Sequence, residues 1–310
     1  MRIELERINK SFGEKHVLKD LGFSAQSGKA FGLLGRNGSG KTTTIRIIMG
    51  IFPQDSGRVS IDGTDYKDKL SRIGYLPEER GLYPKRVIID QMVYFGALRG
   101  MKKSKAKENA ERLLAKLEAT EYMNRKLDTL SKGNQQKIQL AISLITDPDI
   151  LILDEPFSGL DPINASLLKQ LVSEMVDAGK LVIFCSHQMA SVEELCEDLC
   201  IIEQGRIVLS GNLAQIKKGY PRNRVLLSPE SGNFEDLRRK LNESPDVMAM
   251  AASIGTARLG CAVTLKDEGD KNRLYNAVTG LGISLDVFKV MEPTLEEIFV
   301  EKAGGLDAAV

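Results

Sequence analysis

The chain has 310 residues, with 43 basic and 42 acidic side chains and a formal net charge of +1 at pH 7. This length suits two domains better than one. The balanced charge argues against electrostatic binding of nucleic acid as the main role. No apolar run approaches the roughly 20 residues that span a bilayer, and the first residues lack a signal-peptide core. We therefore expect a soluble protein whose membrane part is a separate chain.

The cysteine count does not predict a disulfide framework. Four cysteines scattered over the chain are typical of reduced cytosolic thiols. The spacing of Cys196 and Cys200 predicts that they share one helix face. A metal site there would need partnering ligands in the fold, and we do not expect one.

Residues 3–61 alternate in the manner of strands and hairpins, with Asp62 and Gly63 predicted to form a turn. Within them, residues 35–42 (GRNGSGKT) fit the phosphate-binding loop pattern between an apolar run and a helical pattern. Glycines let successive backbone N–H groups face a polyphosphate, and the following helix directs its positive end to the same place. Lys41 is predicted to reach the β- and γ-phosphates, and Thr42 to offer its hydroxyl to Mg²⁺. The residues predicted to bind nucleotide here are Gly35, Asn37, Gly38, Ser39, Gly40, Lys41, Thr42 and Thr43.

The chain changes character after residues 73–84 (IGYLPEERGLYP). In residues 104–117 the apolar side chains recur at helical intervals, so we expect a mostly helical arm at about residues 84–135. Lysines at 102, 103, 105 and 107 are interpreted as a solvated helix entry, with a lipid contact as the alternative.

Residues 150–156 (ILILDEP) are apolar and then abruptly acidic, as in a central parallel strand whose carboxyl end opens on a ligand crevice. Asp154 is predicted to hold Mg²⁺, usually through water, and Glu155 to polarise the water that attacks the γ-phosphate. A second apolar strand, 181–185, is followed by Ser186 and His187. A neutral His187 imidazole at this position could donate a hydrogen bond to the γ-phosphate, and a passive histidine is the alternative.

Residues 130–136 (LSKGNQQ) precede a helix predicted over 135–145, and a serine hydroxyl with free N–H groups at such a helix start makes a second anion site. A simple N-cap is the alternative. Here the chain resembles the ATP-binding cassette (ABC) family, whose signature usually reads LSGGQ. Ser131 and Gly133 match that signature, whereas Lys132 and Asn134 depart from it. The variant is similar to one carried by several cassette subfamilies, so we expect a working site.

The resemblance covers about residues 3–220 and implies further roles. Asp161, in residues 158–161 (SGLD), resembles part of the family's D-loop, and His187 resembles its switch histidine. Phe12 matches the aromatic position that stacks the adenine ring, with a core phenylalanine as the alternative. The family works as a dimer, so the resemblance implies a homodimer in which the loop around Lys41 of one copy faces Ser131 of the other across ATP.

Glu78 stands where most of the family has a glutamine that contacts Mg²⁺ or the lytic water. A glutamate can also coordinate Mg²⁺, but its charge near Asp154 and Glu155 is expected to couple the pKa values of these carboxylates. A salt-bridged loop residue is the alternative for Glu78.

Residues 222–310 are predicted to form a small α+β domain after an ABC domain at 1–220. Strands are expected at 225–227, 262–265 and 284–290, and helices at 234–241 and 271–278. The segment contains no phosphate loop or catalytic cluster. Its closing residues 292–299 (EPTLEEIF) resemble the end of cassettes from bacterial drug- and sodium-exporter type systems that carry an extra C-terminal domain.

The sequence patterns predict an α/β P-loop ATPase with a helical arm and an α+β accessory domain, and the resemblance implies that the ATPase part is a mixed-sheet ABC cassette. The resemblance implies the ATP-hydrolysing subunit of a type-2 exporter, which uses ATP and Mg²⁺, binds separate integral-membrane permease subunits and lies on the cytoplasmic face of the cell membrane. A soluble cassette that acts on ribosomes or DNA is the alternative. Such proteins usually hold two cassettes or a long coiled-coil insertion, and neither pattern is present here.

Overall fold

The computed structural model describes residues 1–79, 81–231 and 233–307. The chain divides into two compact units. The first holds Met1–Leu213 together with the residues from Phe299 onward, and the second holds Ala214–Ile298. Among the described residues, no helix combines the length and the apolar character that crossing a membrane requires.

The first unit contains an antiparallel four-stranded sheet in the order β2-β1-β4-β5. Its strands are β1 (Arg2–Phe12), β2 (Lys15–Gln26), β4 (Ser56–Ile61) and β5 (Thr64–Asp65). The predicted turn is present and joins β4 to β5. Its two residues, Asp62 and Gly63, have positive φ angles of 50° and 76°. Two consecutive positive φ angles match the twist of a tight hairpin.

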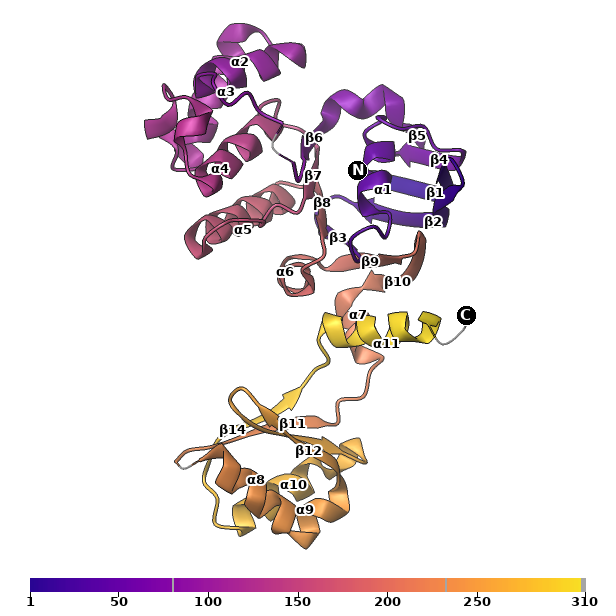
Figure 1. Ribbon diagram of the computed structural model, residues 1–310, viewed down its shortest axis with the longest axis vertical. Helices are drawn as coiled ribbons and strands as arrows, with labels where there is room; N and C mark the ends of the chain where they lie inside the picture. Colours follow the sequence, from indigo (N-terminus) through magenta and orange to yellow (C-terminus); the bar gives the residue numbers. More distant parts are fainter. Residues whose placement is uncertain (80, 232, 308–310) are drawn as a thin grey trace. The chain divides into compact units, whose positions relative to one another are not determined.

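A six-stranded mixed sheet has the order β10-β9-β3-β8-β7-β6 (Figure 1). Its strands are β3 (Ala30–Leu34), β6 (Ile73–Leu76), β7 (Ile150–Asp154), β8 (Leu181–Ser186), β9 (Asp198–Glu203) and β10 (Arg206–Asn212). All neighbouring pairs are parallel except β9 and β10. β3, β7 and β8 are buried along their whole length, which explains their continuous apolar sequence. The carboxyl ends of the parallel strands therefore meet at one edge.

Helices cover the sheets and build a separate lobe. Figure 1 shows α2, α3 and α4 gathered beside β6; α2 and α3 lie within residues 84–135, where the arm is predicted, and α4 extends beyond them. The helical segments of this unit are α1 (Lys41–Ile48), η1 (Tyr66–Arg72), α2 (Ile88–Leu98), α3 (Lys103–Lys116), η2 (Thr120–Tyr122), η3 (Leu127–Thr129), α4 (Lys132–Ser143), α5 (Pro162–Asp177) and α6 (Met189–Leu195).

One hydrophobic core joins the two sheets through α1. It contains Ile3 of β1, Ile45 and Ile48 of α1, Ile152 of β7 and Ile183 of β8, all fully buried. α1 follows the phosphate loop directly, so this packing fixes the loop relative to both sheets. Large buried side chains of this kind typically contribute about 1.5–3 kcal/mol each.

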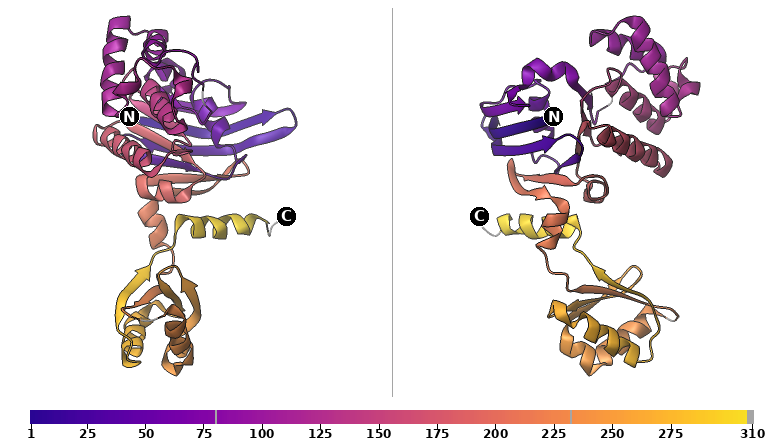
Figure 2. Two further views of the ribbon diagram at one scale, coloured as in Figure 1. Left: turned by 60° about the vertical axis from the view of Figure 1, so that its left-hand side comes forward. Right: turned by 180° about the vertical axis from the view of Figure 1, so that it is seen from behind.

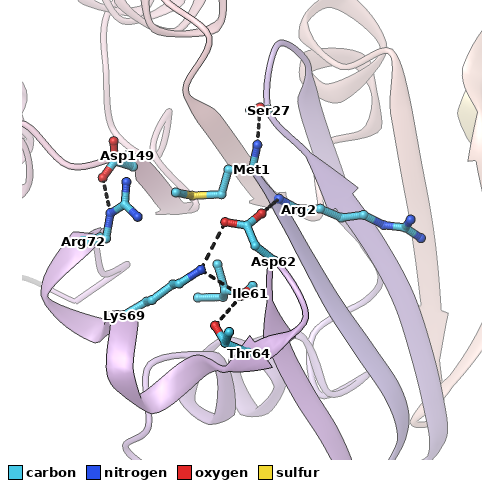
Figure 3. A network of polar contacts seen from close by, with 9 residues as sticks. All are labelled: Met1, Arg2, Ser27, Ile61, Asp62, Thr64, Lys69, Arg72 and Asp149. Carbon is cyan, nitrogen blue, oxygen red and sulfur yellow. Dashed lines mark hydrogen bonds and ion pairs between the residues drawn. The ribbon is translucent and has the colours of Figure 1, made fainter.

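Polar contacts hold the segments that lead into β6 and β7 (Figure 3). Asp62 accepts a hydrogen bond from the Arg2 backbone N–H at 2.7 Å and contacts Lys69 Nζ at 3.2 Å. Arg72, just before β6, pairs with Asp149, just before β7, and the Asp149 N–H donates to the Arg72 carbonyl at 3.0 Å. The two strands therefore start in register, with Ile73 paired with Ile150.

The second unit is a βαββαβ sandwich. Its antiparallel sheet has the order β12-β13-β11-β14, and Figure 2 shows helices packed on one face of it. This order and connection define the ferredoxin-like topology. The elements are β11 (Arg224–Pro229), α8 (Phe234–Glu243), α9 (Pro245–Met250), β12 (Ala251–Ala257), β13 (Gly260–Leu265), η4 (Glu268–Asp270), α10 (Lys271–Gly280) and β14 (Leu285–Met291).

Two further helices, α7 (Leu213–Lys218) and α11 (Leu295–Asp307), run across the divisions between the units. The five elements predicted for the second unit are present. The sequence pattern does not predict β12, because the alternation in this strand is weak: glycine, serine, threonine and alanine stand where large apolar side chains would mark a strand.

The predicted pairing of Cys196 with Cys200 on one helix face is wrong. α6 ends at Leu195, Cys196 has an extended backbone, and Cys200 lies in β9. Two residues four positions apart share a helix face only if the helix includes both of them. Here the helix ends before Cys196 and a strand begins at Asp198. All four cysteines are free and buried. In the described part of the chain, no group of three or more His, Cys, Asp or Glu side chains is arranged to hold a metal ion.

Candidate nucleotide site

The phosphate loop connects β3 to α1 and depends on its glycines. Gly35, Gly38 and Gly40 have φ angles of 154°, 80° and 118°, in the region that favours glycine. A Cβ at Gly35 would lie 2.2 Å from the Ile202 carbonyl oxygen, and one at Gly40 would lie 2.6 Å from a Leu18 methyl group. Apart from its chain neighbours, no atom of the described residues lies within 4 Å of the Cβ position of Gly38. The loop is therefore packed tightly at its ends and open at its middle.

The polar groups inside this loop are suited to binding an anion. Lys41 is 6% exposed, and its Nζ donates to the carbonyl oxygens of Gly35 at 2.7 Å and Arg36 at 3.1 Å. Ser39 Oγ is buried without a hydrogen-bond partner among the described residues. The N-terminus of α1 has no side-chain cap and no acidic residue in its first turn. A polyphosphate fits such a site, because it offers acceptors to the helix N–H groups and to the lysine.

A pocket of about 460 Å³ opens over the loop. Three carboxylates reach it from the ends of β6 and β7, where they face the lysine and threonine of the phosphate loop. The lining residues are Lys15, Val17, Asn37, Gly38, Gly40, Lys41, Thr42, Thr43, Glu78, Asp154 and Glu155. Hydroxyl and carboxylate oxygens are the ligands that Mg²⁺ prefers, so Thr42, Glu78 and Asp154 are a suitable donor set.

Asp154 is only 2% exposed. Burial, reinforced by the nearby charges of Glu78 and Glu155, raises the pKa of Asp154 from its ordinary 3.8 to about 6. The Tyr75 hydroxyl lies 3.4 Å from its Oδ2 and opposes this shift of the Asp154 pKa. The effect expected of the Glu78 charge on a neighbouring carboxylate is therefore seen in the raised pKa of Asp154.

Glu155 is held by the end of β8. Ser186 Oγ donates to its Oε2 at 2.9 Å, and the His187 backbone N–H donates to its Oε1 at 2.7 Å. Glu155 itself has a φ of 48°, an uncommon conformation for a residue with a side chain, and it is 5% exposed. A carboxylate accepts about four hydrogen bonds, so this arrangement leaves Glu155 capacity for a water molecule.

His187 reaches the same carboxylate with its ring. Nδ1 lies 2.6 Å from Glu155 Oε1, and the side chain is 47% exposed. With an ionised Glu155, Nδ1 is the donor, so a neutral ring keeps a lone pair at Nε2. In this geometry Nε2 could donate to a phosphate only from a protonated ring. The predicted donation by a neutral imidazole therefore requires the ring to release Glu155 first.

Ser131, Gly133 and Asp161 form a second group outside the pocket. Ser131 caps α4 by accepting the Asn134 N–H at 3.3 Å, as the N-cap interpretation predicts. A Cβ at Gly133 would lie 3.1 Å from Asn164 Nδ2 and 3.8 Å from Asp161 Oδ2. Asp161 caps α5, and hydrogen bonds led by that from the Asn164 N–H lower its pKa. The signature and the D-loop segment of one chain are thus neighbours.

Phe12 lies at the end of β1 and is 43% exposed, which excludes the core alternative. Its ring packs edge-on against Phe52, with a centroid separation of 5.4 Å, and Lys10 Nζ lies over it. It does not line the pocket over the phosphate loop, whereas Lys15 and Val17 do. The turn at Gly13 could have identified these two, because it returns the strand alongside Phe12.

Another contact of the phosphate loop comes from far along the chain. The Arg36 guanidinium lies over the ring of Phe299, 5.4 Å from its centroid. Phe299 is 4% exposed and groups with the first unit. A cation over an aromatic face is attracted by the ring's quadrupole. No local pattern in the sequence joins two residues so far apart.

Two family models match the chain. The model described as ABC transporter matches residues 18–158, and the model described as ATP-binding protein DrrA1-3-like, C-terminal domain, matches residues 211–303.

Several curated proteins are similar over most of the chain. The ABC transporter ATP-binding protein YhaQ of Bacillus subtilis is 38% identical over 98% of this chain and 99% of its own length. The linearmycin resistance ATP-binding protein LnrL of the same organism is 31% identical over 97% of this chain and 98% of its own. The Nod factor export ATP-binding protein I of Paraburkholderia xenovorans is 34% identical over 67% of this chain and 70% of its own.

Solved structures show the same cassette fold. The ATP-binding subunit of an ABC transporter superposes with a TM-score of 0.65 at 26% identity, covering 71% of this chain and 93% of that one. CbiO1 of Clostridium perfringens, part of the transporter complex CbiONQ, gives a TM-score of 0.62 at 26% identity, covering 69% of this chain and 89% of that one.

Proposed function

Because the chain belongs to the exporter-type branch of the ABC transporter ATP-binding proteins, we propose that it drives separate membrane-spanning permease subunits of an exporter. The members of this family are ATPases. The observation that carries this proposal is the pocket in which Lys41, Thr42, Glu78, Asp154 and Glu155 converge. It combines a phosphate cradle with a metal donor set and a carboxylate that can orient water.

Each group has a defined role in this proposal. Lys41 and the loop N–H groups bind the β- and γ-phosphates, and Phe12 stacks the adenine. Thr42, Glu78 and Asp154 hold Mg²⁺, which supplies neutralisation of the phosphate charge when it is bound. Glu155 orients the attacking water and accepts its proton, while Ser186 and His187 keep the carboxylate in place. Residues 35, 37–40 and 43 complete the cradle.

We propose that the working form is a homodimer with two composite sites. Ser131 and Gly133 stand at the N-terminus of α4, whose first turn contains no acidic residue. That helix end suits the γ-phosphate of a nucleotide bound by another copy. Asp161 lies beside Gly133 and would contact the same composite site.

We also propose a role for each of the two domains. The ABC domain predicted at 1–220 performs the chemistry, and the accessory domain predicted at 222–310 contributes to dimerisation or coupling, except that its last residues, from Phe299 onward, group with the first unit. The protein lies on the cytoplasmic face of the membrane through its permease partner, and nucleic acid is not a partner. The names of the relatives mention export and resistance, which supports an exporter but not a particular cargo.

The test uses the Glu155→Gln variant. It keeps the phosphate cradle but removes the carboxylate, so hydrolysis should slow about 10²-fold or more, or about 2.7 kcal/mol of barrier. In Mg-ATP the variant should accumulate as a dimer in light scattering, whereas Lys41→Ala should stay monomeric. A Glu155→Gln protein that remains monomeric with saturating nucleotide contradicts the composite site. Co-purification of an integral-membrane protein from solubilised membranes tests the transport role separately.

A further inference from the structure

Helix α4 directs two buried glutamines at the loops that carry the pocket's acidic groups. Gln136 and Gln139 are 5% and 4% exposed and lie three residues apart, which places them on one helix face. Gln136 Nε2 donates to the Pro156 carbonyl at 3.4 Å, one residue beyond Glu155. Gln139 contacts the other loop, after β6. α4 therefore touches the chain next to both carboxylate-bearing positions.

The two hydrogen bonds of Gln139 enclose Glu78. Its Nε2 donates to the carbonyl oxygen of Pro77 at 2.9 Å and to that of Glu79 at 3.1 Å. A carboxamide nitrogen carries two N–H donors in one plane, so a single side chain holds the backbone on both sides of Glu78. The Glu78 side chain is exposed and lines the pocket with Asp154. Its direction depends on the backbone that carries it.

We propose that Gln139 is a positioning residue for Glu78, and that it holds the loop so that the Glu78 carboxylate faces the metal position beside Asp154. This deepens the proposed function and rests on it, because the metal role of Glu78 belongs there. Gln139 is not among the residues that line the pocket, and it acts through the backbone at 77–79.

The other end of the Gln139 amide supports this role. Its Oε1 is buried without a hydrogen-bond partner in the part of the chain that the structure describes. Leaving a buried acceptor unpaired opposes folding, so an apolar side chain of similar length would serve the core better. The contact with the Glu78 loop is what an apolar side chain could not supply.

α4 also connects this contact to the signature. The helix starts at the Ser131 cap and reaches the Glu78 loop two turns later. In the proposed dimer, Ser131 faces the partner's nucleotide. A shift of α4 on closure of one composite site would therefore be transmitted to the metal position of the other.

The experiment compares Gln139→Met with Gln135→Met in the full chain. Gln135 is a matched control, since it lies on the same helix and its Nε2 also donates to two carbonyls, those of Leu127 at 3.2 Å and Leu130 at 3.0 Å. ATPase activity is measured against Mg²⁺ at fixed ATP. Gln139→Met should raise the half-saturating Mg²⁺ concentration about tenfold, or about 1.4 kcal/mol. Gln135→Met should change it less than twofold, and neither variant should alter ATP binding in EDTA.

A double-mutant cycle and hydrogen exchange separate the possible failures. Glu78→Ala should raise the Mg²⁺ requirement, and adding Gln139→Met should then change it less than twofold, because both act through one carboxylate. Fully additive effects overturn the inference. Backbone exchange over residues 73–79 should be faster in Gln139→Met than in Gln135→Met, and unchanged exchange overturns the inference alone. If Glu78→Ala leaves the Mg²⁺ requirement unchanged, the metal role of Glu78 fails, and the inference fails with it.

Discussion

Replacing Asp154 by Asn should stabilise the nucleotide-free protein at neutral pH. The pKa of Asp154 is about 6 in the folded chain, against an ordinary 3.8, because the carboxyl is buried near Glu78 and Glu155. The two values differ by about two, and each tenfold change is worth about 1.36 kcal/mol. Keeping Asp154 ionised in the folded state therefore costs about 3 kcal/mol. Asparagine has nearly the same shape and no charge, so it removes this cost.

The pH dependence gives the sign of the effect. A carboxyl with a raised folded pKa binds its proton more tightly in the native state, so its cost is absent below pH 3.8 and complete above about pH 6. The gain from Asp154→Asn should be about 3 kcal/mol at pH 8 and about half of that at pH 5. Urea unfolding of both proteins in EDTA, at each pH, measures the difference in free energy of unfolding.

The control is Asp177→Asn at the exposed end of α5. It should change stability by less than about 0.5 kcal/mol at either pH. A decrease in the stability of Asp154→Asn at pH 8, or a gain that does not grow between pH 5 and pH 8, would refute the reasoning. Mg-ATP provides a second check, because it should stabilise the wild type more than the variant if Asp154 binds the metal.

Three other outcomes are expected. Mixing the Lys41→Ala and Ser131→Arg proteins should restore part of the ATPase activity, because a dimer with one copy of each variant would contain one intact composite site. If subunit exchange is proven and no activity returns, the composite arrangement is contradicted. Phe299→Ala should weaken ATP binding about two- to fivefold by releasing Arg36, worth about 0.5–1 kcal/mol, whereas Val300→Ala at an exposed position should not, as calorimetry would show. The four buried cysteines should react with a thiol reagent only on unfolding, and fast labelling of the native protein contradicts their burial.

The sequence could predict those parts of the site that are local. The phosphate loop, the acidic end of β7 and the serine cap of α4 each follow from a few adjacent residues, because a loop or a strand end creates its geometry within one turn of chain. The helical arm follows from periodicity in the same way, whereas the mixed sheet is expected from the resemblance to the ABC family. The contact of Arg36 with Phe299 and the hydrogen bonds of Gln139 do not, since they join segments that only the folded chain brings together.

The two neighbouring acids at the end of β7, Asp154 and Glu155, differ in ways that the sequence pattern alone does not predict. Asp154 remains in the strand, buried beside like charges, and this environment raises its pKa. Glu155 leaves the strand with a positive φ and receives hydrogen bonds from Ser186 and His187. The backbone change between these two residues thus separates a carboxylate that burial and like charges destabilise from one that is oriented by hydrogen-bond donors. Two residues adjacent in sequence therefore have different environments. The difference depends on the sheet order, because β8 lies beside β7 and its end supplies the donors to Glu155.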